Sequence, residues 1–529
     1  MVWNEFGTDL VVVGGRNKDP QGYNIVTGRY PFAEDQNMPG KLYGRILGSA
    51  HAHANILSID TSAAEALEGV KAVITYEDNP RWTGHLQGVD QEVAAVAAVD
   101  EATAERALDL IDVEYEVLPH VIDVDEAMQS NANNAGTFPD SNFNPSPSRS
   151  SRGDVAAGFA EADVTIDETV GWLASHTHNH IEPDDTLAWW EGEDVHFWTK
   201  NQSPHGKKTG GASSLGLKHN QVHVKSGGTG GGFGGGGSSN PEIAAALLSK
   251  KAGKPVALRL ARRFQTVLVQ HQYGVKLQMK IGAKNDGTLT AIESVWWGDG
   301  RMNGGRSGWN DPDVSTWKVA NYSATMHGIT TNKGRSGAWR CVAHPEGQYL
   351  SDLVLEKMAA QLNINPLEFR RKMFVTEDMP YQSNGRPMAS FGVRKCMEGV
   401  ATAISYMAKY HDPGARTLPD GRMHGIGIHA HSDGHGSTTS SNRGSYILMN
   451  RDGTAYFNSG STRIHGGPVA MATMIAETIG ITFDDIQIAG WGNTDTTPDG
   501  GGQFGSLHTG SHGSPAVVAA RDIRNQLFT

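Results

Sequence analysis

Hydrophobic and polar residues alternate in short stretches over the first part of the chain, which predicts strands separated by helices. The apolar runs 70–75 and 92–99 are typical of strands, and the second reads as a strand buried on both faces. Residues 101–110 have the spacing of an amphipathic helix. Strand and helix alternation of this kind predicts a compact α/β unit over residues 21–126.

The apolar pattern stops between residues 127 and 153, where Asn, Ser and Pro dominate and a linker is expected. A second α/β region follows over 154–392, and a third covers 393–529. The predicted elements of these two regions are strands 186–190, 195–199 and 221–225 and helices 351–362 and 516–527. The fold class is therefore α/β (α+β) with several domains.

Composition narrows the class of protein. The 529 residues carry a formal net charge of −12, which lacks the basic footprint of a nucleic-acid binder. Apolar runs such as 93–99 are too short to span a bilayer, and the first twenty residues lack the basic start of a secretory signal. We expect a cytoplasmic protein with neither nucleic acid nor membrane as a partner.

Glycine and cysteine usage are both unusual. The chain has 65 Gly, well above the usual share of about 7 %. It has 2 Cys, Cys341 and Cys396, which excludes a disulfide framework and a four-cysteine iron–sulfur site within this chain.

The strongest local motif is a glycine loop, residues 227–237, with the sequence GGTGGGFGGGG. A strand-like VHVK precedes it, and Asn240, Pro241 and Glu242 predict the capped start of a helix after it. Strand, glycine loop and helix start together predict an anion cradle, because glycine lets backbone N–H groups approach a ligand closely. A flexible surface loop is the alternative, against which the central Phe233 argues. No Gly-Lys-Ser/Thr follows, which disfavours a nucleotide P-loop.

Several segments in collinear order resemble a known family. They are GKLYGRILGSAHAHANILSIDTSAAEALEGVKAVIT, EVAAVAAVDEATAERALDLIDVEYEVLP, Ile181-Glu182-Pro183 with WTKNQSPHG, GGGFGG, Arg340 with Pro345-Glu346, NPLEFRRKMF and IAETIGITFDDIQIAGWGNTDTTPDGGG. Their order resembles the large, molybdenum-cofactor-binding subunit of the xanthine dehydrogenase and aldehyde oxidase family. The resemblance covers nearly the whole chain.

The resemblance implies a hammerhead-like α/β domain (21–126), a linker (127–153), a first molybdopterin-binding domain (154–392) and the N-terminal part of a second (393–529). It implies a molybdenum pyranopterin (molybdopterin), with a cytosine dinucleotide as one form, and no protein ligand on the metal. The cofactor-binding residues implied by position are Gly231, Gly232, Phe233, Gly234, Arg340, His176, Gly505 and Ser506. Val342 and Glu346 would line the substrate pocket.

The chain departs from the family pattern at four places. The closing part of the last lobe, with the glutamate that serves as general base, has no counterpart, so we expect a truncated or split form whose partner chain supplies that glutamate. The Lys after GGFGG and the position after it are Gly236 and Gly237, and the Gln ahead of the Glu-Pro step falls at His176. A later Gly-Gln-Gly turn appears as His465-Gly466-Gly467. These departures argue against a purine substrate.

The implied activity is that of a molybdenum hydroxylase: hydroxylation of a small aromatic, N-heterocyclic or carbonyl substrate, with water as the oxygen source. Electrons would leave through a [2Fe–2S] subunit and an FAD subunit, because this chain lacks the cysteines for such clusters. Two alternatives remain open: a molybdenum-dependent hydratase of an activated C=C bond, and a cofactor-free scaffold subunit.

Some residues have both a functional and a structural interpretation. His176, His178 and His180, and likewise His429, His431, Asp433 and His435, have spacings that could hold zinc, although core or pocket-lining histidines are the preferred interpretation. Cys341 is read as an inert residue in a packed turn. Glu346 is either a pocket carboxylate or a surface turn residue.

Overall fold

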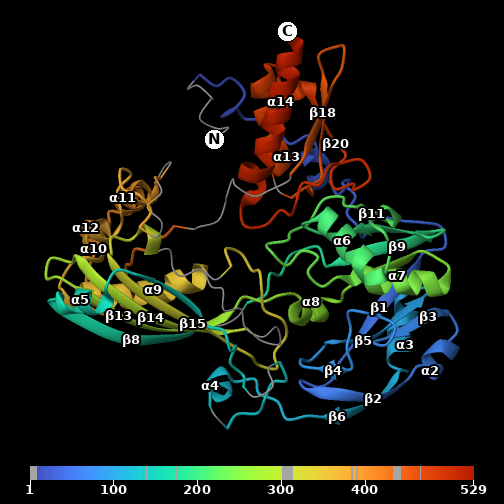
Figure 1. Ribbon diagram of the computed structural model, residues 1–529, viewed down its shortest axis with the longest axis horizontal. Coiled ribbons are helices and arrows are strands. Elements are labelled where there is room, and N and C mark those ends of the chain that lie inside the picture. Colours follow the sequence, from blue (N-terminus) through green and yellow to red (C-terminus); the bar gives the residue numbers. More distant parts are fainter. Residues whose placement is uncertain are drawn as a thin grey trace.

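The chain folds into three bodies arranged around a common centre (Figure 1). The computed structural model describes residues 9–129, 131–137, 141–173, 176–300, 314–342, 344–382, 385, 387, 388, 391–432, 443–464 and 466–528. Figure 1 shows a seven-stranded sheet body on the right, a five-stranded sheet body on the left and the C-terminal lobe at the top.

The right-hand body is built on one mixed sheet. Its order is β11 (Val222–Lys225), β10 (Asp194–Thr199), β9 (Asp185–Glu191), β12 (Val256–Arg259), β1 (Leu42–Gly48), β5 (Glu92–Ala98) and β3 (Val70–Thr75). β1 pairs in parallel with β12, with Leu42 opposite Val256. The sheet therefore crosses the boundary expected near residue 126 and joins the N-terminal region to the next one.

Strand β5 is buried along its whole length, as its unbroken apolar run predicts. On one face Ala95 and Ala97 pack in a cluster with Ala244–Ala246 of helix α7 (Pro241–Ala252). On the other face its alternate residues pack against helices α2 (Ser62–Ala66) and α3 (Glu101–Leu108). A smaller sheet lies below, with the order β4 (His85–Leu86), β2 (Ala54–Asp60) and β6 (Asp112–Val117).

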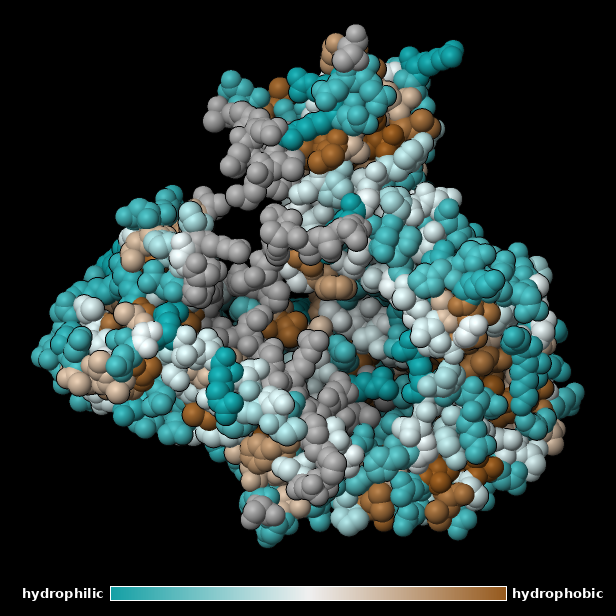
Figure 2. All heavy atoms as spheres, viewed as in Figure 1, coloured by the Kyte–Doolittle hydropathy of each residue, from teal (hydrophilic) through white to brown (hydrophobic). Residues whose placement is uncertain are grey.

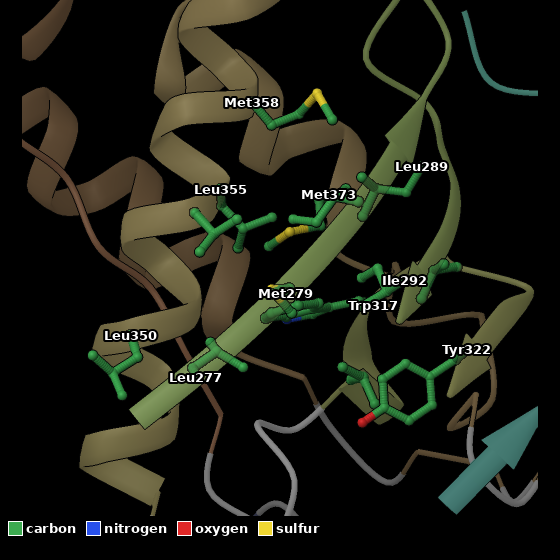
Figure 3. Close-up of a cluster of buried hydrophobic side chains, with 14 of the residues drawn as sticks. Leu277, Met279, Leu289, Ile292, Trp317, Tyr322, Leu350, Leu355, Met358 and Met373 are labelled. Carbon is green, nitrogen blue, oxygen red and sulfur yellow. The ribbon is translucent and has the colours of Figure 1, made fainter. Parts of the chain in front are cut away.

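The left-hand body is built on a second sheet. Its order is β7 (Ser148–Arg152), β15 (Asn321–Ile329), β14 (Leu289–Asp299), β13 (Gly274–Ala283) and β8 (Val164–Leu173). Leu350, Leu355 and Met358 of helix α9 (His344–Gln361) pack on Leu277 and Met279 of β13 (Figure 3).

The stretch expected to be a linker includes a β-strand that the sequence pattern did not predict. Residues 148–152 form the edge strand β7, which pairs with β15, and α4 (Val124–Ala127) begins just before the stretch. Asn142 is buried, and its side-chain oxygen accepts a hydrogen bond from the N–H of Ala135 at 2.9 Å. The strand was missed because an edge strand with exposed Ser and Arg side chains shows no hydrophobic alternation.

The C-terminal lobe has a three-stranded sheet of β18 (Ser445–Met449), β19 (Ala455–Ser459) and β20 (Ile486–Ala489). Helices α13 (Gly467–Ile479) and α14 (Gly513–Leu527) pack against each other in its core. Residues 11–13 lie beside this lobe, where their N–H groups donate to Glu477 of α13.

The remaining elements are short. They are α1 (Gly22–Val26), α5 (Val155–Ala160), α6 (Pro204–Leu215), α8 (Arg262–Leu268), α10 (Pro366–Met373), α11 (Val393–Ala403), α12 (Tyr406–Lys409), β16 (Arg416–Thr417) and β17 (Met423–His424). Figure 2 shows a mainly hydrophilic surface with scattered hydrophobic side chains, some of them on the C-terminal lobe. In the described part of the chain, no helix has the length and apolar character needed to cross a bilayer.

Candidate functional site

The glycine loop is a folded turn between β11 and α7. The N–H groups of Gly235 and Gly236 both donate to the carbonyl of Gly232, at 2.8 and 3.1 Å. Gly231, Phe233 and Gly234 have φ values of 101°, 52° and 99°, in the region that favours glycine. These hydrogen bonds argue against the flexible-loop alternative.

Two buried carboxylates, one on each side of Pro183, hold the two ends of this loop. Glu182 accepts the N–H of Gly230 at 2.5 Å. Asp184 accepts the N–H of Gly237 at 3.1 Å and the hydroxyl of Ser239 at 2.6 Å. The Glu-Pro step that the sequence motifs singled out therefore acts as a clamp on the loop.

Lys200 lies behind the clamp with a fully buried side chain. Its Nζ donates to the Glu182 carbonyl at 2.5 Å and lies 3.4 Å from Asp184 Oδ1. Burial alone would raise the pKa of Asp184, but Lys200 and the loop donors outweigh it and lower that pKa. Burial raises the pKa of Glu182 to about 7. At neutral pH Asp184 is therefore ionised, whereas Glu182 is about half protonated.

Gln202 holds the middle of the loop and joins it to the C-terminal lobe. Its Oε1 accepts the N–H groups of Gly234 and Gly236 at 3.0 and 3.2 Å. Its Nε2 donates to the carbonyl of Gln503 at 2.7 Å, and the Gln503 N–H donates back to the Gln202 carbonyl at 2.8 Å. The position of the loop is thus tied to that of a segment about 300 residues further along the chain.

Two positions of the loop have room for glycine only. A Cβ on Gly232 would lie 2.5 Å from Gln202 Oε1, and one on Gly234 would lie 2.3 Å from the carbonyl oxygen of Ala338. Arg340 completes this side: its N–H donates to the Phe233 carbonyl at 3.0 Å, and its guanidinium carbon lies 4.3 Å from the Phe233 ring centroid. The structure therefore brings Phe233 and Arg340, which were both predicted as cofactor-binding residues, into contact with each other.

A second group of polar side chains gathers in the C-terminal lobe. Arg443, Gln503, His508 and His512 each carry a buried nitrogen with no hydrogen-bond partner among the described residues. Burial lowers the pKa of His508 to about 4 and that of His512 to about 3, so both rings are neutral at pH 7. Buried unsatisfied nitrogens of this kind favour a bound polar ligand that supplies the missing partners.

The predicted residues of this lobe lie among that group. Gly505 and Ser506 have φ values of 60° and 55°, and Ser506 is exposed. Sequence reasoning missed Arg443, Gln503, His508 and His512, which no short motif marks. Their common signal is position, since three of them flank the predicted Gly505-Ser506 turn.

Among the three alternating histidines, His178 rather than His176 contacts the loop. The His178 Nε2–H donates to the Ala338 carbonyl at 2.7 Å, and a Cβ on Gly235 would lie 2.6 Å from its Nδ1. Burial lowers the pKa of His178 to about 4. His176 is exposed, with its ring centroid 6.3 Å from that of Trp339, and its role in cofactor binding stays a prediction.

The expected cap of the helix after the loop is wrong at one residue. Asn240 has φ 48° and ψ 47°, and its side chain makes no capping hydrogen bond. Its Oδ1 instead accepts the Lys207 Nζ at 2.8 Å, because Lys207 also pairs with Glu242 at 2.7 Å in the first turn. Pro241 occupies the first helical position as predicted.

The two predicted pocket residues lie beyond Arg340. Val342 is half-buried and packs against the core of the five-stranded sheet. Glu346 is fully buried in the first turn of α9, so the surface-turn interpretation is wrong. Cys341 is exposed with φ 51°, which corrects the expectation that it packs in a turn.

Replacing Glu346 by Gln is expected to flatten the pH dependence of stability. Burial raises the pKa of Glu346 from 4.5 to about 7, so the folded protein keeps a proton that the unfolded chain releases in this window. Stability of the native protein therefore falls as pH rises from 4.5 to 7. The native protein should lose about 3 kcal/mol of unfolding free energy over this range, and the variant should not. Urea unfolding at pH 5 and pH 8 measures the free energy of unfolding of both proteins, with the exposed Glu193→Gln as control. The same change in this free energy between the two pH values in the native protein and in Glu346→Gln would contradict the prediction.

The zinc interpretation of the histidines gains no support. Within the described ranges, no group of three or more His, Cys, Asp or Glu side chains could hold a metal ion. His429 Nδ1 lies 3.2 Å from Asp352 Oδ2. Asp433, His435 and His465 lie outside the described residues.

Three family models match consecutive parts of the chain. Residues 27–119 match the aldehyde oxidase and xanthine dehydrogenase a/b hammerhead domain. Residues 137–374 and 400–529 each match a molybdopterin cofactor-binding domain. The expected hammerhead domain followed by molybdopterin-binding domains is confirmed.

Whole-chain comparisons agree with the domain matches. A putative xanthine dehydrogenase molybdenum-binding subunit of Escherichia coli is 27 % identical over 91 % of this chain and 68 % of that protein. The carbon monoxide dehydrogenase large chain of Afipia carboxidovorans is 28 % identical over 97 % of this chain and 70 % of that protein.

A solved structure shares the fold. Quinoline 2-oxidoreductase from Pseudomonas putida 86 superposes with a TM-score of 0.84 at 22 % identity, over 98 % of this chain and 71 % of that chain.

Proposed function

We propose, on the premise that this chain belongs to the xanthine dehydrogenase and aldehyde oxidase family of molybdenum hydroxylases, that it is the molybdenum-cofactor-binding catalytic subunit of a multi-subunit oxidoreductase. The reaction is hydroxylation of a small aromatic, N-heterocyclic or carbonyl substrate with water as the oxygen source. The observation that carries this proposal is a glycine loop held by Glu182, Asp184 and Gln202, together with buried nitrogens in the C-terminal lobe that lack partners among the described residues.

The residues present fit a molybdopterin in shape and in chemistry. Glycines 232 and 234 let the loop pack directly on Gln202 and on the Ala338 carbonyl, which holds the loop backbone in one conformation for a ligand. Gln503 and Arg443 offer buried donor nitrogens, and a guanidinium suits a phosphate or other oxyanion. The bound group would supply a redox-active metal that serves as Lewis acid and activates water.

The chain's own side chains bind and orient in this proposal. Gln202 sets the direction of the Gly234 and Gly236 N–H groups, and the Glu182–Asp184 clamp fixes both ends of the loop. Arg340 keeps a positive charge above the Phe233 ring. Neutral His178 supports the loop by packing against Gly235, without adding a charge there.

The proposal includes further subunits of the complex. Further subunits carry [2Fe–2S] clusters and FAD. The names of relatives support a multi-subunit assembly, since one is a subunit gamma of a 6-hydroxypseudooxynicotine dehydrogenase complex from Paenarthrobacter nicotinovorans. Mass spectrometry of the natively purified complex identifies these chains, and iron and flavin analysis assigns their cofactors.

Molybdenum content is the direct test. The complex purified under native conditions should contain about one molybdenum per copy of this chain. Inductively coupled plasma mass spectrometry, with the pterin released and identified by its nucleotide, gives this ratio. An active complex without molybdenum would refute the proposal and favour a cofactor-free scaffold. Turnover that needs no electron acceptor would instead favour hydration of a C=C bond.

A further inference from the structure

The N-terminal arm, residues 9–38, contacts both the C-terminal lobe and the glycine loop of the seven-stranded sheet body. Figure 1 shows the blue N-terminal segment passing from the C-terminal lobe toward β11. The family models begin at residue 27, so the first half of the arm lies outside every matched domain. Its contacts therefore call for a separate explanation.

The first end of the arm is held by the C-terminal lobe. Glu477 of α13 accepts the N–H groups of Val12 and Val13 at 2.6 and 2.9 Å. Asn17 donates to the Thr473 hydroxyl at 3.0 Å. Between arm and lobe a cleft of about 1120 Å³ stays open. These polar contacts, together with packing of Val12 against the hydrophobic core of the lobe, hold this end.

The second end of the arm packs under the start of the glycine loop. A Cβ on Gly228 would lie 2.6 Å from the Tyr30 ring, and one on Gly227 would lie 2.8 Å from the Pro31 carbonyl oxygen. Both glycines are therefore required for the close approach of the arm. Any displacement of Tyr30 changes the support beneath the loop.

Arg463 is the residue at which arm, C-terminal lobe and glycine loop meet. Its carbonyl accepts the N–H of Thr229 at 3.0 Å, where Gly228 and Arg463 form a parallel bridge. Its buried guanidinium forms an ion pair with Asp19 and lies 5.1 Å from the Tyr30 ring centroid. One side chain thus fixes two points of the arm while its backbone fixes the loop.

We infer that Arg463 is a positioning residue that sets the position of the glycine loop through the N-terminal arm. The arm thereby holds the C-terminal lobe and the seven-stranded sheet body together around the ligand. The Asp19 carboxylate and the Tyr30 ring hold the guanidinium in one direction, and this direction fixes the backbone that pairs with Thr229. Loss of the Arg463 side chain releases the arm, and with it the Arg463 backbone that pairs with the glycine loop. The part of this inference that concerns the ligand rests on the proposed function.

Hydrogen exchange on the purified complex tests the inference without relying on activity. Arg463→Ala should speed exchange of the Thr229 amide, in a peptide covering 227–237, by about tenfold or more. Peptides from β5 should be unchanged, because β5 is buried within the seven-stranded sheet between β1 and β3. Arg463→Lys keeps the charge for Asp19 and should restore slow exchange. Molybdenum content should fall at least twofold in the alanine variant and recover in the lysine variant.

Controls separate the possible outcomes. Arg371→Ala removes a guanidinium that pairs with Glu368 and Glu398 on α10 and α11, and it should leave the loop peptide unchanged. If Arg463→Ala does not fold, Asp19→Asn, which removes only the charge of the partner, carries the test. Unchanged loop exchange in a folded Arg463→Ala protein overturns the inference. Wild-type protein without molybdenum would refute the proposed function, yet the exchange result would still decide the role of Arg463.

Discussion

Gly234→Ala is expected to abolish cofactor retention and to destabilise the protein by about 3 kcal/mol. The residue has φ 99°, and the new Cβ would lie 2.3 Å from the carbonyl oxygen of Ala338, a backbone atom that cannot rotate away. Relief of the contact requires the loop to move, which breaks the Gly234 N–H bond to Gln202. Molybdenum content per chain and urea unfolding measure the two effects.

Gly253→Ala provides the matched control for this substitution. Gly253 also has a positive φ, 63°, but its Cβ would meet nothing within 4 Å. We expect a loss of about 1 kcal/mol from backbone conformation alone and full retention of molybdenum. Similar behaviour of the two variants would mean that the contact with Ala338 does not constrain the site.

Lys200→Met is expected to cost about 3–5 kcal/mol of stability, because it leaves the buried carboxylate of Asp184 without its cation. The deficit depends on pH with a defined sign. In the native protein the pKa of Asp184 is lowered, so its stabilising effect is present above its ordinary value of 3.8 and is lost as pH falls. In the variant that pKa rises, so the deficit should shrink at acid pH. Urea unfolding at pH 5 and pH 8 measures it.

The double variant Asp184→Asn with Lys200→Met tests the cause. Removal of both charges should recover much of the lost stability, because no unpaired ion remains buried. The side-chain oxygen of the introduced asparagine can still accept the Gly237 N–H. A double variant as unstable as Lys200→Met alone would show that packing of the lysine stem, rather than the ion pair, is what matters.

Local patterns in the sequence predicted the elements well where one pattern covers one element. The apolar runs at β3 and β5 and the helix after the glycine loop have the expected places. Edge strand β7 was missed because its polar side chains, mostly exposed, carry no apolar alternation. The seven-stranded sheet was missed as a unit, because strand pairing between β1 and β12 leaves no trace in either segment.

The candidate site shows the same limit. The glycine loop and Arg340 were predicted from motifs, and the structure brings them together. The residues that hold the loop were not predicted, because Gln202 and Gln503 meet across 301 positions and Asp184 acts through space. His178, which contacts the loop, was not singled out among the three histidines, because alternation alone cannot tell which face of a segment is buried.

The shared sheet also bears on how the chain reaches its fold during synthesis. β1 and β5 are synthesised before β12, so the second edge of β1 has no partner strand until Val256 has left the ribosome. An open edge of this length invites pairing with other nascent chains. The N-terminal region therefore completes its sheet only together with the cofactor-binding body, and yield in a foreign host should rise with chaperone supply.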